Sequence, residues 1–66
     1  MNLTLNGKHF NAPDKYSISD LVIALGYTNK NIAIEVNEII IAKSRHHSFN
    51  LKEDDKIEII EAVGGG

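Results

Sequence analysis

Hydrophobic and polar residues alternate with a period of two near both ends of the chain, and a helical period lies between them. Residues 2–6 alternate polar and apolar side chains, as a half-buried strand does. Asn6-Gly7 favours a type I′ hairpin turn, which needs positive φ at both central positions. The pattern therefore predicts a returning strand over residues 8–12, which Pro13 ends because proline has no backbone N–H to donate.

The next segment has the period of a helix. Apolar residues recur at i, i+3, i+4 and i+7, namely Ile18, Leu21, Val22 and Leu25. Ser17 stands before this run with Asp20 three residues later, which is the spacing of a capping box. Gly26 lies where a helix would end in a left-handed residue. The pattern predicts a helix of about eight residues, too short to be stable alone, whose apolar stripe must lie on a sheet.

The period returns to two after a polar loop at residues 28–31. Ile32, Ile34 and Val36 point one way along this predicted strand. The pattern then predicts a turn at Asn37-Glu38, a short strand over 39–41, an irregular polar segment over 43–50, a charged turn over 53–55 and a last strand over 56–63. The run over 39–41 can be read as strand core or as a surface that docks a partner.

These elements predict one α+β domain over residues 1–66, with the helix covering one face of the sheet. A hairpin is not stable alone, so we expect the N-terminal hairpin to pair with the last strand. The chain would then leave the sheet from a central strand, and residues 63–66 would form a flexible tail ending in Gly64-Gly65-Gly66.

Composition excludes several function classes. The chain has no cysteine, so neither disulfides nor a thiolate zinc site can stabilise it. A net charge of −2 without a basic cluster argues against nucleic acid as a partner. No apolar run is long enough to span a membrane, and residue 1 opens directly into a strand pattern rather than a signal peptide. We expect a cytoplasmic protein.

The chemistry-bearing side chains do not form an obvious active site. His46 and His47 would point to opposite sides of an extended chain, and His9 is remote in sequence, so no metal site is predicted. Ser17 with Asp20 is interpreted as a helix cap rather than a nucleophile with its base. Nothing follows the glycines at the end, whereas a phosphate-binding loop needs a helix after it, so the chain itself should bind neither ATP nor another cofactor.

The whole chain resembles the ubiquitin-like β-grasp proteins, and among them the bacterial sulfur carriers of thiamine biosynthesis. The supporting stretches are "LNGK", "SISDLVIAL", "IAIEVN", "KSRHH" and, most specifically, the terminal "KIEIIEAVGGG". Glu38, Ala42 and Asp54 depart from the usual family pattern at turns and leave the tail unchanged. The resemblance implies a mixed four- to five-stranded sheet with one helix across a face.

The resemblance also implies a function in which the chain is a protein cosubstrate and not an enzyme. An E1-like adenylyltransferase would use ATP to adenylate the carboxylate of Gly66. Sulfur from a cysteine desulfurase would then convert it to a thiocarboxylate, which donates sulfur to thiazole synthase. Gly64 and Gly65 would thread into the partner's active site, because glycine allows close approach of partner groups.

Two questions stay open: which residues dock the partners, and which pathway the chain serves. Candidate docking residues for these partners are Ile40, Lys43, Arg45, Glu58, Glu61 and Val63. The alternatives to the thiamine pathway are a carrier like the small subunit of molybdopterin synthase, and a ubiquitin-like modifier or interaction module without sulfur chemistry.

Overall fold

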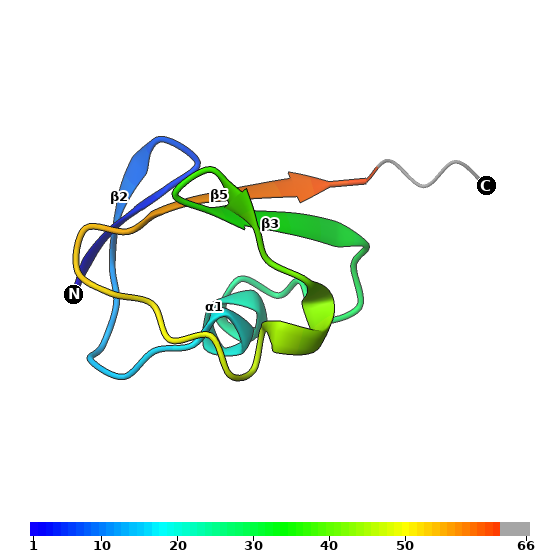
Figure 1. Cartoon of the computed structure of the whole chain (residues 1–66), viewed down its shortest axis with the longest axis horizontal. Coiled ribbons are helices and arrows are strands. Elements are labelled where there is room, and N and C mark those ends of the chain that lie inside the picture. Colours follow the sequence, from blue (N-terminus) through cyan, green and yellow to red (C-terminus); the bar gives the residue numbers. More distant parts are fainter. Residues whose placement is uncertain (63–66) are drawn as a thin grey trace.

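The computed structural model describes residues 1–62 as a five-stranded mixed sheet with one α-helix on one of its faces (Figure 1). The strand order is β2-β1-β5-β3-β4. The strands are β1 (Asn2–Leu5), β2 (Lys8–Asn11), β3 (Ile32–Val36), β4 (Ile39–Ile40) and β5 (Lys56–Glu61). The predicted α+β fold class and the pairing of the hairpin with the last strand are confirmed.

Helix α1 (Ile18–Ala24) begins and ends for the reasons that its sequence indicates. The Ser17 hydroxyl accepts the Asp20 N–H at 3.1 Å, and the Asp20 carboxylate accepts the Ser17 N–H at 2.9 Å, so the predicted capping box forms. Gly26 follows the C-cap with a φ of +76°, the left-handed conformation that glycine adopts without strain. The helix is seven residues long and buries Ile18 and Leu21 completely.

The hydrophobic core lies between α1 and the sheet. Its fully buried members come from both, and they are Leu3, Ile18, Leu21, Ile34 and Ile57. In β5 the inward side chains alternate with outward ones, because successive strand residues point to opposite faces. The helix therefore covers one face of the sheet and leaves the other uncovered, as Figure 1 shows.

Strand β5 occupies the centre of the sheet. It runs parallel to β1, with Leu5 opposite Ile57, and antiparallel to β3 over five residues of β3, Ile32–Val36. The long β3 pairing extends from Val36 opposite Ile57 to Ile32 opposite Glu61. Strand β5 is thus paired with a neighbouring strand on each side.

The structure corrects several element boundaries. Strand β2 ends at Asn11, one residue early, although the Ala12 N–H still donates to the Met1 carbonyl at 2.9 Å and the Ala12 side chain is buried. Strand β4 has only two residues, although the Ile41 N–H still donates to the carbonyl of the buried Ile34 at 2.9 Å. The segment predicted to be irregular begins with a 3-10 turn, η1 (Lys43–Arg45).

The predicted last strand, residues 56–63, is strand through Glu61, and Val63 lies outside the described residues. Asp55, predicted as part of a charged turn, is instead buried, with its carboxylate accepting the Asn37 Nδ2–H at 2.9 Å and the Lys52 N–H at 2.8 Å.

Candidate docking site around strand β5

The residues that sequence analysis placed in the tail lie outside the described part of the chain. These are Val63, Gly64, Gly65 and Gly66. The candidate site is therefore built from the residues that precede them: the end of β5 and the sheet surface around it.

The last residues of β5 are held from the β3 side. The N–H of Ala62 donates to the carbonyl of Asn31 at 2.8 Å, which continues the ladder one residue beyond the strand. The carboxylate of Glu61 pairs with the Lys30 ammonium at 3.3 Å, and both side chains are about half exposed. Glu61, a predicted docking residue, is thus already engaged within the molecule by a surface ion pair, which holds it only weakly. Nothing in the sequence pattern singled out Lys30.

Two of the predicted docking residues, Ile40 in β4 and Glu58 in β5, lie on the uncovered face of the sheet. Ile57 and Ile59 point into the core, so Glu58 and Ile60 point to the opposite face. Cross-strand partners share a face, and the register extends this surface to β3 and β4. We call this surface the open-face patch; it consists of Ala33, Glu35, Ile40, Glu58 and Ile60.

The open-face patch is apolar with acidic residues within it. Ile40 is 71% exposed and Ile60 is 53% exposed, unusual for isoleucine in a strand. Glu35 lies between Ile40 and Glu58 in the register. The patch combines apolar contact area with negative charge, which suits a partner surface that carries apolar and basic groups.

Ile23 is exposed to a similar extent but belongs to α1, on the covered side of the sheet. The run over residues 39–41 is therefore divided: Ile41 is core, as one interpretation predicted, whereas Ile39 and Ile40 are exposed.

Lys43 and Arg45 do not join the open-face patch. Both belong to η1, which lies on the same side of the sheet as α1 (Figure 1). The Arg45 guanidinium lies 6.0 Å from the centre of the Phe49 ring, within the range of a cation–π contact. The predicted docking residues thus divide between two sides of the molecule.

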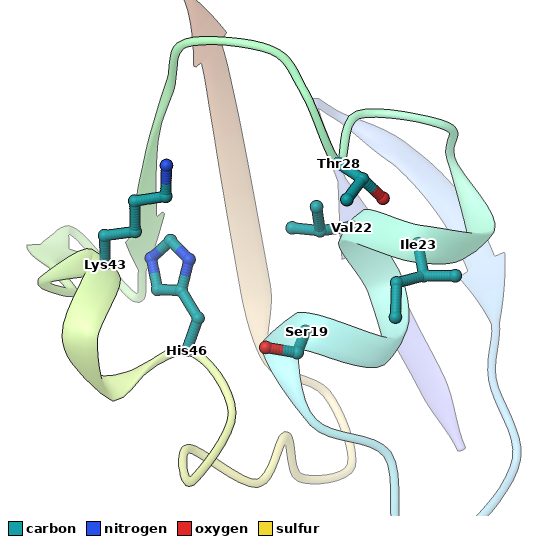
Figure 2. A pocket seen from close by; sticks show the side chains of 6 residues that line it. All are labelled: Ser19, Val22, Ile23, Thr28, Lys43 and His46. Atoms are coloured by element: carbon teal, nitrogen blue, oxygen red, sulfur yellow. The ribbon is translucent and has the colours of Figure 1, made fainter.

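A small pocket of about 230 Å³ lies between α1 and η1. Its walls carry one ammonium group, one imidazole, two hydroxyls and two aliphatic side chains, from Ser19, Val22, Ile23, Thr28, Lys43 and His46. Figure 2 shows the His46 ring between Lys43 and the helix. The ring is buried, and its Nε2 is 3.1 Å from the carbonyl of Ile41, so this histidine joins η1 to the end of the β4 segment.

The other ionisable residues are arranged as structural contacts. His9 Nε2 lies 2.9 Å from the Asn2 side-chain oxygen. The Asn2 side chain donates to the Glu53 carboxylate at 2.8 Å, and the Asn2 backbone N–H adds a second hydrogen bond at 3.1 Å. Both hydrogen bonds from Asn2 lower the pKa of Glu53, because they favour the charged carboxylate. The bond from the Asn2 side chain is the larger cause. Within residues 1–62, no three potential metal ligands come together, and no helix is long and apolar enough to cross a membrane.

Comparison with known proteins assigns this arrangement to a family. Residues 2–66 match the model of the ThiS family. The sulfur carrier protein ThiS of Bacillus subtilis is 42% identical over 65 residues, which cover 97% of this chain and 98% of that protein. A crystal structure of the thiamine biosynthesis protein ThiS from Geobacter metallireducens superimposes with a TM-score of 0.85 at 26% identity, over the full length of both chains.

A third similarity is of a different kind. The thiazole synthase of Magnetococcus marinus is 32% identical over 66 residues, which are all of this chain but only 20% of that enzyme. A segment resembling this chain is therefore part of a larger polypeptide in that relative.

Proposed function

Because this chain belongs to the ThiS family and is a sulfur carrier protein of thiamine biosynthesis, we propose that Gly66 carries the sulfur as a thiocarboxylate. The observation that supports this role most directly is the position of β5. It is the central strand of the sheet, and residues 63–66 continue from it. The partner enzyme can thereby bind the folded body while the terminal residue reacts.

The chemistry begins with a carboxylate that must be activated. An α-carboxyl group has a pKa of about 3.5, so it is ionised at neutral pH and is a poor electrophile. In the proposed first step, an oxygen of the Gly66 carboxylate attacks the α-phosphorus of ATP and releases pyrophosphate. The terminal sulfur of a donor persulfide then attacks the carbonyl carbon of the acyl-adenylate, AMP leaves, and an acyl disulfide forms. A second thiol of a partner enzyme attacks the donor's own sulfur in that disulfide, which forms a new disulfide with the donor and releases the thiocarboxylate. The result replaces one carboxylate oxygen by sulfur.

All of these steps take place on partner enzymes. An E1-like adenylyltransferase binds the ATP, and a cysteine desulfurase or another donor supplies the sulfur; the chain itself holds no cofactor and no metal. Four extended residues reach about 14 Å at most, so residues 63–66 can enter a covered site while the sheet stays outside. Gly64 and Gly65 let groups of the partner approach the backbone closely.

Thiazole synthase is the proposed acceptor of the sulfur. The relative from Magnetococcus marinus supports this partner, because there a segment like this chain is joined to a thiazole synthase. Covalent attachment raises the effective concentration of one module at the other, which is useful only when the two modules work together. The match to the ThiS family favours this acceptor over the molybdopterin pathway and over a modifier without sulfur chemistry.

We propose further that the open-face patch docks the body on the adenylyltransferase. Ile40 and Ile60 supply apolar contact, while Glu58 and Glu35 meet basic side chains of the partner. Glu61, two residues before the tail, and Val63, its first residue, contact the rim of the partner site. Lys43 and Arg45, on the other side of the sheet, contact a different partner or a different part of the same one.

The proposed function is tested by the intact mass of the protein after incubation with ATP, the E1-like enzyme and a sulfur source. We expect a species in which sulfur replaces one oxygen, localised to Gly66 by fragmentation. Deletion of Gly66 should abolish this species and leave the melting temperature unchanged, because Ile59 is the last core residue within residues 1–62. Loading of the deletion variant at the wild-type rate would contradict the assignment of Gly66.

A further inference from the structure

Two asparagines hold the central strand, one near each end. Asn6 and Asn37 each open a two-residue hairpin turn, and both have left-handed φ values, +48° and +51°. The Asn37 side-chain oxygen accepts the Lys56 N–H at 3.0 Å, at the start of β5. The Asn6 side-chain oxygen accepts the Ile59 N–H at 2.7 Å, close to the end of the same strand.

The Asn6 side chain replaces a strand residue in the ladder. Strand β1 pairs with β5 only at Thr4 opposite Lys56 and Leu5 opposite Ile57, after which β1 turns into its hairpin. The Asn6 N–H still reaches the Ile57 carbonyl at 2.9 Å. Two residues further along β5, the Asn6 side chain makes the hydrogen bonds that a residue of β1 would otherwise make. It accepts the Ile59 N–H and donates to the Ile59 carbonyl at 3.4 Å.

The turn itself does not require an amide at this position. A positive φ is met by glycine with less strain than by asparagine. What asparagine adds is a donor and an acceptor on one short side chain, and here both face the same residue of β5. Beyond Ile59, the hydrogen bonds that the structure shows on the described part of β5 come from the β3 side, including that of Ala62 to Asn31.

We propose that Asn6 is a positioning residue for sulfur loading: it holds the end of β5 so that the reacting tail starts from a fixed point. This inference rests on the proposed function of Gly66. Residues 63–66 offer only about 14 Å of reach, so the position of the end of β5 limits where the carboxylate can go in a partner site. Misplacement of a reacting group by about 1 Å is enough to slow a positioned reaction greatly.

Three single variants separate positioning from stability. Asn6→Gly keeps the left-handed turn and removes the side-chain contacts with Ile59. Asn37→Gly is the control at the opposite end of β5, because it removes the side-chain contact with the Lys56 N–H, together with the hydrogen bond to Asp55. Asn6→Asp keeps an acceptor for the Ile59 N–H and tolerates a positive φ, so it is the conservative variant.

The first measurement is the steady-state rate of thiocarboxylate formation with the E1-like enzyme, ATP and a sulfur source. Asn6→Gly should lower kcat by about tenfold, the effect of losing roughly one net hydrogen bond, with KM within about twofold because the docking patch is unchanged. Asn37→Gly should leave kcat within about twofold of wild type, even where its melting temperature falls at least as far. Asn6→Asp should restore most of the rate.

The second measurement needs no partner. Amide hydrogen exchange should accelerate at Ile59 and Ala62 in Asn6→Gly, and Ala62 should keep its wild-type rate in Asn37→Gly. A kcat for Asn6→Gly equal to that of Asn37→Gly, or unchanged exchange at Ala62, would overturn the positioning role. Failure of the wild-type protein to load sulfur is a separate outcome, which overturns the proposed function and the loading role of Asn6 with it.

Discussion

Replacing Ile60 by threonine tests whether the open-face patch docks the activating enzyme. Ile60 lies on the uncovered face of the sheet and is 53% exposed, so the exposed part of its side chain contributes little to the stability of the folded protein. Threonine keeps the β-branch that strands favour. We therefore expect a change of less than about 0.5 kcal/mol in the free energy of unfolding, as for most surface substitutions.

The expected effect on binding follows from the groups that are lost. Isoleucine to threonine exchanges an ethyl group for a hydroxyl. Burial of each CH₂ contributes about 0.8 kcal/mol, so two carbons contribute about 1.6 kcal/mol if docking covers them completely. Because the Ile60 side chain is already partly covered in the free protein, about 1 kcal/mol is the expected loss. This corresponds to a rise in Kd of about fivefold.

The assay is isothermal titration of the E1-like enzyme with the carrier, and Ile23→Thr is the matched control. Ile23 is 66% exposed, at least as much as Ile60, but it lies on α1, on the other side of the sheet. Both variants lose the same atoms, and isoleucine and threonine have similar helix propensities. Only Ile60→Thr should weaken binding.

Two results would refute this reasoning. Equal Kd values for Ile60→Thr and wild type would show that the partner does not cover the patch. A larger effect for Ile23→Thr would place the docking surface on the helix side, where Lys43 and Arg45 also lie.

Three further predictions concern the folded body. Ser17→Ala should lower the free energy of unfolding by about 1 kcal/mol in urea denaturation, because it removes the side-chain cap of α1; an unchanged midpoint would contradict the role of the capping box. Asp55→Ala should cost about 2 to 3 kcal/mol in the same assay, since it strands two hydrogen-bond donors near the core. The control Asp54→Asn, at an exposed turn whose φ of +69° asparagine tolerates, should cost little. The lowered pKa of Glu53 predicts a contribution to stability that is present above the unfolded pKa and is lost as pH falls through the folded pKa; carboxyl NMR titration measures it, and Glu53→Gln should remove this part of the pH dependence.

Local elements were predictable because their causes lie within a few residues. The hairpin needs Asn6-Gly7, whose backbone conformations the turn demands, and both residues do have positive φ. The capping box needs only Ser17 and Asp20, three positions apart. The pairing of the first hairpin with the last strand was also predictable, because a lone hairpin is not stable and the last strand was the obvious partner.

The environment of single side chains required the tertiary structure. Three consecutive isoleucines are equivalent in sequence, yet Ile41 is buried while Ile39 and Ile40 are exposed. Ile41 bonds to the buried Ile34 of β3, whereas Ile40 lies opposite Glu35 on the uncovered face. Within the acidic run over residues 53–55, only the tertiary structure shows that Asp55 is buried. Its hydrogen-bond partner, Asn37, lies 18 residues earlier in the chain. Such contacts depend on which strands become neighbours, which no local pattern encodes.

The sequence by itself thus determined the fold class, the helix with its cap and, through the resemblance carried by its last residues, the kind of function. The central place of the last strand was predicted as well. Only the tertiary structure decided that Ile40 and Ile60 share an uncovered face with Glu58, and that Asn6 reaches across 53 residues to hold Ile59. The physical reason is range: backbone preferences and caps act between neighbours in the chain, whereas burial and strand register arise when distant segments pack together.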